Sequence, residues 1–305
     1  MTGLLAAPPA PLRAALWYTA ALSCWGVAAG LIRFAVAYLP PLELGFLRSS
    51  IAVVLTLPWL IQARAFPLPR RNLGLYLLRG GLEVVAIATW FAALGLMQAA
   101  DVVALGFTTP LFSSLLAALF LRERIRLRRS LAILVGMLGA LLIVRPANLL
   151  GGGAIGAAAI LPLVASAAAG ASRMIGRRLS QSEPAVTIVA SLGFVTAPAL
   201  LPLALPVWQP VTLAGLGLAT LIAAISLSGH VFMVRALRLE GVAALAPYEF
   251  AQMLTAVAFG IAVLSEWPDL WTWIGSAVIL GAAVYTVRRE AQLARLAQRQ
   301  ASAGP

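Results

Sequence analysis

The chain has 305 residues, of which 62% are hydrophobic and only 10% charged, and its mean hydropathy is +0.96. Soluble globular domains are about half apolar and about a quarter charged, so this composition excludes that class and indicates a membrane protein. The net charge is +12, but all 22 basic residues are arginines, most of them in short gaps between apolar runs, which excludes the continuous basic face that nucleic-acid binding needs.

The apolar runs predict ten membrane-spanning helices, since about 20 apolar residues cross a hydrocarbon core of roughly 30 Å. In chain order, the expected spans are 14–34, 42–62, 73–96, 101–121, 130–146, 153–173, 185–205, 211–235, 242–264 and 269–288. We interpret residues 1–13 and 289–305 as tails outside the membrane. The run after Arg13 is too long for a signal-peptide core, so we expect an uncleaved first span. The expected fold is therefore an all-α integral membrane protein.

The arginines also predict how the spans are oriented. They gather in the gaps after even-numbered spans, most densely in the stretch LRERIRLRR, and are scarce in the other gaps. Because cytoplasmic loops carry an excess of arginine and lysine, this alternation places both termini in the cytoplasm.

A weak internal repeat divides the chain into two halves. The stretch ADVVALGFTTP leads into a span that ends at Glu123, and GVAALAP leads in the same way to Glu266. Each half, 14–148 and 149–288, then holds five spans, so the second half enters the membrane from the opposite side. Inverted repeats with a binding site at their interface are typical of secondary transporters. At their span ends, Glu123 and Glu266 are expected to be exposed loop anchors.

Three stretches, in this order and spacing, carry a family resemblance: LRSSIAVVL, then LRGGLEVVAIATWFAALGLMQAADVVALGFTTPLF, then APYEFAQMLTAVAFGIAVLSEW. The chain resembles the drug/metabolite transporter superfamily, specifically its EamA-type family of ten transmembrane helices. The resemblance implies a carrier of small metabolites in the cell inner membrane, with a central cavity between two five-helix halves. It leaves the cargo and the direction of transport open.

Five ionisable side chains fall well inside the predicted spans: Arg48, Arg79, Glu83, His230 and Glu249. Such a group costs about 2.5–3.5 kcal/mol at membrane depth on insertion scales, so each needs a partner or a wet cavity. Two positive and two negative groups balance, which predicts one interior network. Glu249 and His230 are also candidates for proton coupling, because both can change charge.

In the third span, Arg79 and Glu83 are four residues apart and share a helix face, to which Trp90 returns within about 20°. We expect this face to line the cavity, and the alternative is an internal salt bridge that only closes its own charges. Arg48 has no acid within one turn. Its partner is therefore Glu83, Glu249 or an anionic group of the substrate.

In the ninth span, Tyr248 and Gln252 share a face that Glu249 borders, just after a proline that would bend the helix. We expect these residues to line the cavity, together with Thr109 of the fourth span and Trp25 of the first. The alternatives are a kinked helix that bonds its neighbours, a hydroxyl that bonds its own backbone, and ordinary aromatic packing.

The expected function is a secondary transporter that moves a small amino-acid-like or heterocyclic metabolite, anionic or zwitterionic, by alternating access. The alternatives are an intramembrane enzyme and a membrane receptor or structural protein. HExxH and P-loop motifs are absent, Cys24 and His230 alone do not make a zinc site, and Asp101 and Asp269 lie at span edges, which argues against an aspartyl dyad. We expect no enzyme activity, no cofactor and no metal, and a monomer or weak homo-oligomer in the lipid bilayer.

Overall fold

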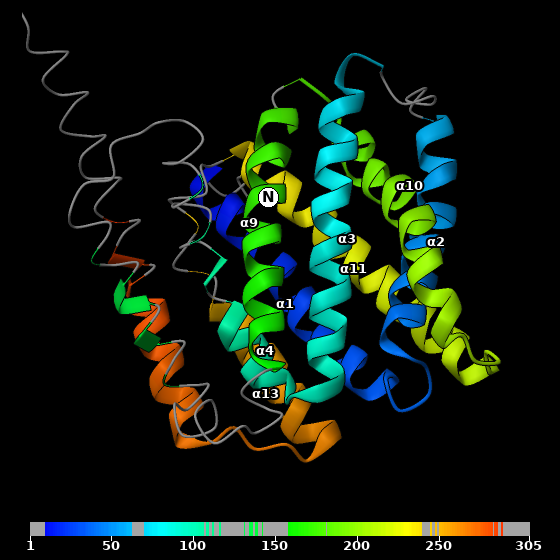
Figure 1. The fold of residues 1–305 in the computed structure, drawn as a ribbon. Coiled ribbons are helices and arrows are strands. Elements are labelled where there is room, and N and C mark those ends of the chain that lie inside the picture. The colour runs from blue at the N-terminus through cyan, green and yellow to red at the C-terminus, as the bar shows by residue number, and fades with distance from the viewer. Residues whose placement is uncertain are drawn as a thin grey trace, which may run out of the picture.

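All regular elements in the described part of the computed structural model are helices (Figure 1). That part comprises residues 10–62, 70–106, 158–180, 182–239 and 250–282, with single positions between 108 and 142, at 245 and 248, and at 284, 285 and 288. The first half contains α1 (Ala10–Ala35), α2 (Pro41–Gln62), the 3-10 turn η1 (Arg70–Asn72), α3 (Leu73–Leu96) and α4 (Ala99–Gly106). The second half contains α9 (Ile160–Ser180), α10 (Ala185–Ala204), the 3-10 turn η2 (Leu205–Val207), α11 (Leu213–Leu239), α13 (Phe250–Phe259), the π-helix η4 (Gly260–Leu264) and a further helix, Leu270–Ala282.

The length and apolar character of these helices make the protein a multi-pass membrane protein. Five segments are long and apolar enough to cross a bilayer: Leu12–Ala35, Pro41–Gln62, Leu73–Leu96, Ala185–Val207 and Leu213–Leu239. They agree to within a few residues with the first, second, third, seventh and eighth predicted spans. α4, α13 with η4, and Leu270–Ala282 fall at the fourth, ninth and tenth, whereas the predicted fifth span lies largely outside the described residues.

The sixth span differs from its prediction. We expected it to end at Arg173, but α9 continues to Ser180. Hydropathy falls over the last two turns because α9 carries serine, glycine and arginine there, several of which face a cavity inside the bundle. Polar residues on one face lower the hydropathy of a helix without ending it.

The helices of the two halves pack in a symmetric pattern. α1 packs on α11, and α9, its counterpart by order in the second half, packs on α3. In the same way α10 contacts α3 while α2 contacts α11, and the pairs α2–α10 and α4–α13 meet across the middle. Figure 1 shows α9 beside α3 and α10 beside α2. Two repeats related by a pseudo-two-fold axis produce this exchange of equivalent partners.

Small residues let the halves approach each other closely. Gly26 and Gly30 of α1 face α13, where a Cβ at the first would clash with Thr255 and a Cβ at the second with the Phe259 ring. This small-xxx-small spacing brings helix backbones together in membranes, where dispersion contacts drive association.

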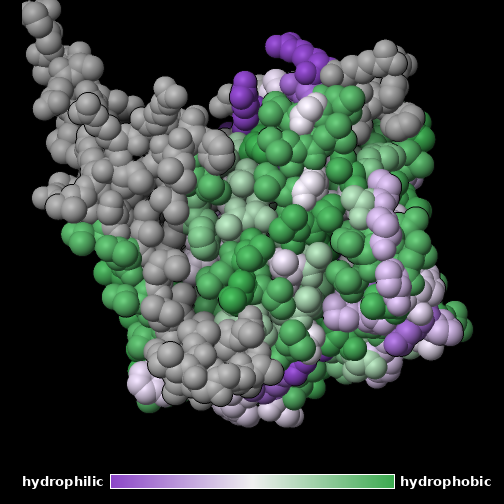
Figure 2. All heavy atoms as spheres, viewed as in Figure 1, coloured by the Kyte–Doolittle hydropathy of each residue, from purple (hydrophilic) through white to green (hydrophobic). Residues whose placement is uncertain are grey.

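The outer surface is apolar, as expected of helices that face lipid. The face shown in Figure 2 is mostly hydrophobic, and its polar side chains gather toward the ends and along one edge. Trp208, Trp267, Trp271 and Trp273 are each at least 40% exposed: Trp208 follows η2, Trp267 follows η4, and the other two lie near the start of the Leu270–Ala282 helix. Exposed tryptophans at helix ends are typical of the boundary between lipid and water.

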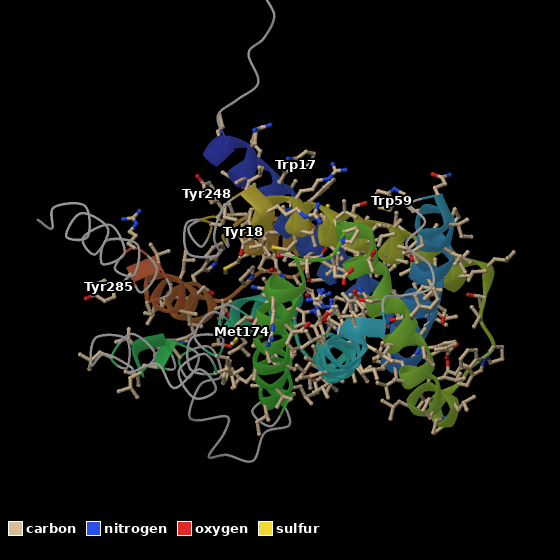
Figure 3. The ribbon with its side chains drawn as sticks, turned by 90° about the horizontal axis from the view of Figure 1, so that it is seen from above. Trp17, Tyr18, Trp59, Met174, Tyr248 and Tyr285 are labelled. Atoms are coloured by element: carbon tan, nitrogen blue, oxygen red, sulfur yellow. The ribbon has the colours of Figure 1, made fainter. Side chains whose placement is uncertain are left out.

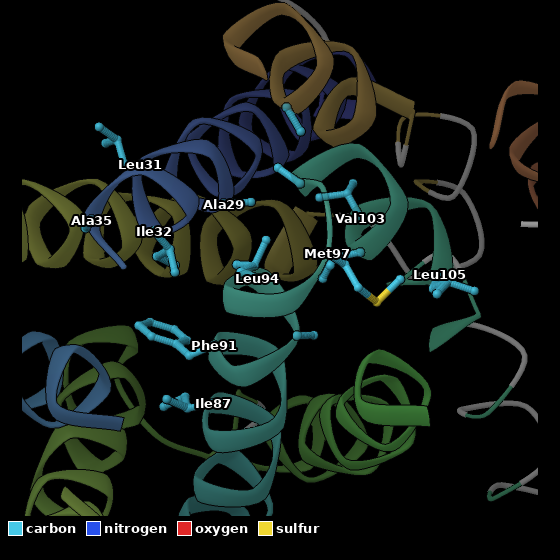
Figure 4. Packing of buried hydrophobic residues seen from close by; sticks show 14 of the residues in the cluster. Ala29, Leu31, Ile32, Ala35, Ile87, Phe91, Leu94, Met97, Val103 and Leu105 are labelled. Atoms are coloured by element: carbon cyan, nitrogen blue, oxygen red, sulfur yellow. The ribbon is translucent and has the colours of Figure 1, made fainter. Parts of the chain in front are cut away.

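A hydrophobic cluster closes the bundle at the end where α1 and α3 finish. It joins Ile32 of α1, Leu94 of α3 and Val103 of α4, among others, and Phe91 and Met97 pack in the same space (Figure 4). Because all five side chains are nearly inaccessible, this end of the bundle is sealed.

An ion pair reinforces the closed end. Arg33 Nε donates to Glu266 Oε1 at 2.9 Å, and its Nη1 reaches the carbonyl oxygens of Leu94 and Gly95 at 3.4 Å. The expectation that Glu266 is an exposed loop anchor is wrong, since its side chain is only 17% exposed. Glu266 links the second half to Arg33 of α1, and Arg33 in turn contacts the end of α3.

Candidate functional site

A cavity of about 200 Å³, here called the central cavity, lies between the two halves. Its walls come from α1, α2, α3 and α4 of the first half and from α9, α10, α11 and α13 of the second. Ile32, Ile87 and Phe91 of the closed end bound it on one side (Figure 4). On the other side its lining reaches Ser180, the last residue of α9, and Leu237, near the end of α11. The cavity therefore extends toward the arginine-rich helix ends.

The structure brings most of the side chains predicted from the sequence to this one cavity. The lining includes Trp25, Arg48, Arg79, Glu83, Trp90, Thr109, His230 and Gln252.

Arg79 and Glu83 of α3 both line the cavity but bond to different partners. Arg79 is only 8% exposed, and its Nη1 donates to the carbonyl oxygen of Ile188 at 2.9 Å. Glu83 Oε2 accepts a hydrogen bond from the Ser172 hydroxyl, also at 2.9 Å. The two side chains make no direct ion pair in the described part of the chain. Each reaches across to the second half instead.

Arg48 of α2 faces Glu83 from another wall of the central cavity. Its guanidinium lies over the Phe91 ring, 5.8 Å from the centroid. Its Nε is buried without a hydrogen bond, as is the Nε of Arg79, and both guanidiniums interact electrostatically with Glu83. A smaller chamber of about 30 Å³ is lined in part by Arg48, Glu83 and His230.

His230 is oriented by its own helix. Its Nδ1 lies 2.9 Å from the carbonyl oxygen of Ser226, and because a carbonyl only accepts, Nδ1 carries the hydrogen. The other ring nitrogen, Nε2, then faces Glu83 Oε1 at 3.9 Å.

The two tryptophans of the cavity each occupy a recess made by a glycine. A Cβ at Gly229 would lie 2.6 Å from Trp25 Nε1, and one at Gly106 would lie 2.8 Å from Trp90 Cη2. Trp25 also stands edge-on to the His230 ring, with 5.2 Å between centroids. The missing side chains at these glycines set how far each indole reaches into the cavity.

The ninth span contributes less than its sequence predicts. Gln252 of α13 lines the cavity, but Tyr248 does not: it is 40% exposed, and Figure 3 shows it toward the periphery, on the side where Trp17 lies. The expectation failed because α13 begins only at Phe250, so the spacing of four residues that would align Tyr248 with Gln252 does not run within one helix. Glu249 lies outside the described residues.

In the fourth span, Thr109 lines the cavity with its hydroxyl hydrogen already donated to the carbonyl oxygen of Gly106, at 2.7 Å. This bond to its own helix is the alternative that the sequence left open. The hydroxyl therefore offers a ligand its acceptor capacity and not its donor.

The α9 wall of the cavity was not predicted. Ser166, Ser172, Arg173 and Gly176 all line the cavity, and the Arg173 guanidinium lies over the Trp25 ring at 5.8 Å from its centroid. We placed Arg173 at a span end because hydropathy drops there. Small and polar residues that recur every three or four positions through this stretch were the signal of a cavity-facing side.

Two aspartates meet outside the central cavity. The Thr272 hydroxyl lies 2.5 Å from Asp101 Oδ1 and 2.8 Å from Asp269 Oδ1, and the Thr272 N–H also donates to Asp269. The two acids come together through Thr272 because the start of α4 packs near the start of the Leu270–Ala282 helix, which Asp269 caps. Neither acid lines the cavity, and among the described residues no three His, Cys, Asp or Glu side chains form a metal-binding group.

An all-helical membrane fold with two equivalent halves around a cavity that charged side chains help to line defines the protein as a carrier-type membrane protein. The chain belongs to the EamA-like transporter family, whose model matches residues 12–145 and 156–288, one match in each half.

Several relatives are named transporters. The riboflavin transporter of Brucella anthropi is 27% identical over 272 residues, which cover 85% of this chain and 92% of that protein. The pseudopaline exporter CntI of Pseudomonas aeruginosa is 32% identical over 258 residues, covering 83% and 88%. The S-adenosylmethionine uptake transporter of Rickettsia felis is 24% identical over 251 residues, covering 81% and 83%.

The fold itself has a solved counterpart. A crystal structure that is 19% identical matches with a TM-score of 0.62 over 90% of this chain and 98% of the other. At this identity the match shows a shared fold. The expectation of a transporter is supported by the family and by the names of the relatives.

Proposed function

We propose that this protein is a secondary transporter that carries a small metabolite across the cell inner membrane by alternating access, with the central cavity as its binding site. The observation that carries the proposal is the position of the cavity, which lies between the two repeats and is lined by polar and charged side chains from both. A binding site at the interface of two repeats is exposed to one side and then the other when the repeats rock. Relatives named for riboflavin, pseudopaline and S-adenosylmethionine make a small metabolite the natural cargo class.

The shape of the cavity supports an inward-facing conformation. Its lining extends to Ser180 and Leu237, at helix ends whose flanking arginines favour the cytoplasm, while Arg33 and Glu266 hold the opposite end closed. To release cargo outside, the halves must separate at the Arg33 end and close around Ser180.

The lining side chains have distinct roles in this proposal. Arg48 and Arg79 bind the polar part of the cargo, and Glu83 balances their charge. Trp25 and Trp90 contact its apolar part. The polar rim consists of Thr109, Gln252 and, as the sequence predicts, Glu249, while proton coupling is assigned to His230 and Glu249.

Transport by the purified full chain in liposomes tests the proposal. A panel of labelled cationic, neutral, zwitterionic and anionic metabolites should include at least one that exchanges in a saturable manner without ATP, and Arg79→Ala should abolish that exchange. A folded, reconstituted protein that exchanges no member of the panel would contradict the carrier function. Normal transport by Arg79→Ala and by Glu249→Gln would instead refute the site, and indifference to an imposed pH gradient would refute proton coupling alone.

A further inference from the structure

Helices α2 and α10 occupy equivalent places in the two halves and pack against each other. Exchanging the halves therefore maps this pair onto itself, so the pair lies across the pseudo-two-fold axis. Figure 1 shows the two helices side by side. Their contact is close, since a Cβ added at Gly193 would lie 2.9 Å from Val53 Cγ2 and 3.5 Å from the Ser49 carbonyl oxygen. We call this pair the α2–α10 seam.

At one end of the seam, a carboxylate of the first half binds the second half. Glu43 lies in the first turn of α2 and is fully buried, and its Oε2 accepts a hydrogen bond from the backbone N–H of Gln209 at 3.0 Å. Gln209 lies between the turn η2, which follows α10, and the start of α11. The Phe46 and Trp208 rings meet edge to face beside this bond, with 5.6 Å between their centroids. The start of α2 is thus joined to the segment that follows α10.

The other end of the seam has the equivalent contact with the halves exchanged. Glu183 comes two residues before α10, and its Oε1 accepts a hydrogen bond from Asn72 Nδ2 at 2.6 Å. Asn72 ends the turn η1, which follows α2 and precedes α3, just as Gln209 lies between η2 and α11. The donor is a side-chain amide here and a backbone N–H at the other end. In both places, a glutamate near the start of one helix binds the segment that follows the other helix.

Contacts that are present together with their equivalents are expected to survive the transport cycle. When two inverted repeats exchange conformations, each contact of one state becomes its equivalent in the other state. A contact whose equivalent is already present therefore exists in both states, whereas a contact without its equivalent is made or broken. The bonds of Glu43 and Glu183 are of the first kind.

The ends of the helices beside the cavity are of the second kind. α1 and α3 meet at the closed end through the buried side chains of Ile32 and Leu94. The equivalent ends of α9 and α11 contribute Ser180 and Leu237 to the lining of the central cavity instead. This difference between the halves is what changes hands when the carrier turns from one side of the membrane to the other.

We propose that the α2–α10 seam is a fixed axis, which stays closed at both ends throughout the transport cycle. With the seam intact, the closed end opens by separating α1 from α3, and the cavity closes on the other side by bringing the ends of α9 and α11 together. Glu43 and Glu183 hold the two ends of the seam. The inference rests on the proposed function, because it specifies which helices part and which stay together during alternating access.

Distances between spin labels test the seam without a known substrate. A Cys24→Ser background removes the one cysteine of the chain, and pairs of new cysteines then carry nitroxide labels in the full chain in liposomes. Ile61→Cys near the end of α2 and Ser182→Cys just before α10 report on the seam, and both positions are exposed. Adding Arg33→Gln removes the ion pair with Glu266 and so favours opening of the closed end.

Two further label pairs report on the ends that should move. Tyr38→Cys with Leu96→Cys spans the ends of α1 and α3, Arg178→Cys with Leu239→Cys spans the ends of α9 and α11, and all four positions are exposed. We expect Arg33→Gln to change the ratio of short to long distances about tenfold at both pairs, in opposite directions, as the loss of one charge-assisted hydrogen bond requires. The seam pair should keep one and the same distance with and without Arg33→Gln.

Cross-links provide a second test with transport as the readout. Asn72→Cys with Glu183→Cys, joined by a short bifunctional thiol reagent, should exchange a transported metabolite as fast as the same variant before cross-linking, because the two replaced side chains are in contact at the seam. Arg33→Cys with Glu266→Cys, joined by the same reagent, should lose exchange, because the link prevents the closed end from opening.

The outcomes separate this inference from the proposed function. A seam distance that shifts together with the other two pairs would overturn the fixed seam and leave alternating access standing, as would loss of exchange on cross-linking the seam. Shifts at the other two pairs with an unchanged seam would support it. No shift at any pair would contradict alternating access and with it both proposals. Arg13→Gln, at an exposed arginine near the start of α1, is the matched control and should move no pair.

Discussion

The closed end of the bundle should open when its ion pair is removed. Arg33 and Glu266 are 28% and 17% exposed, so their contact at 2.9 Å is partly shielded from water. A hydrogen bond between charged groups in such a setting contributes about 1.5–3 kcal/mol. The pair exists only while this end is closed, so Arg33→Gln should shift the balance between the two conformations by roughly tenfold or more toward the state open at this end.

A single cysteine can report this shift. Cys24 is the one cysteine of the chain, so a Cys24→Ser background that carries Ala29→Cys has its only thiol in the central cavity. Ala29 is 1% exposed and lies near the closed end. In right-side-out vesicles, a membrane-impermeant thiol reagent should label this cysteine slowly, and Arg33→Gln should speed the labelling by about the factor by which the population shifts.

Charge reversal provides the decisive control. Arg33→Glu and Glu266→Arg should each accelerate labelling from the outside, and the double variant should restore the slow rate because it restores the pair. Arg13→Gln removes a charge from the other end of α1 and should change nothing. Labelling that stays slow in Arg33→Gln, or a double variant as fast as the single ones, would show that the ion pair does not hold this end closed.

Three further predictions concern packing and orientation. Gly229→Ala should push an indole out of its recess and weaken substrate binding about tenfold, whereas Gly217→Ala on the same helix, where a Cβ meets nothing within 4 Å, should not change affinity in a titration. Gly80→Ala should lower the unfolding temperature, since overpacking against α10 costs about 1–3 kcal/mol, while Gly81→Ala next to it should be neutral or slightly stabilising. Reporter tags fused to the two ends of the chain should both be found in the cytoplasm, and a tag detected outside would refute the arginine-based orientation.

The membrane class and most of the spans were predictable because they depend on local properties. An apolar run of about 20 residues is a span whatever surrounds it, and an arginine in a gap is costly to translocate wherever the gap lies. The same logic identified Arg48, Arg79 and Glu83, since an ionisable group inside such a run needs a reason to be there. The order of the spans and the weak repeat then predicted two halves around a cavity.

The partners of those groups were not predictable in the same way. One alternative was a salt bridge between Arg79 and Glu83. Instead, Arg79 bonds to Ile188 and Glu83 to Ser172, both in the second half. Which carbonyl or hydroxyl stands opposite a side chain depends on how each helix is rotated against helices that are distant in sequence. Hydropathy carries no information about that rotation.

The sequence by itself therefore determined that this chain crosses the membrane many times, in two related halves, with a few charged and aromatic side chains inside. Only the tertiary structure decided which side chains share the cavity: it added Arg173 by extending α9 and removed Tyr248 by starting α13 at Phe250. Both corrections concern where a helix begins or ends. Packing against neighbouring helices sets those limits. A polar stretch that lines a cavity can remain helical inside the bundle, whereas the same stretch facing lipid would mark the end of the span.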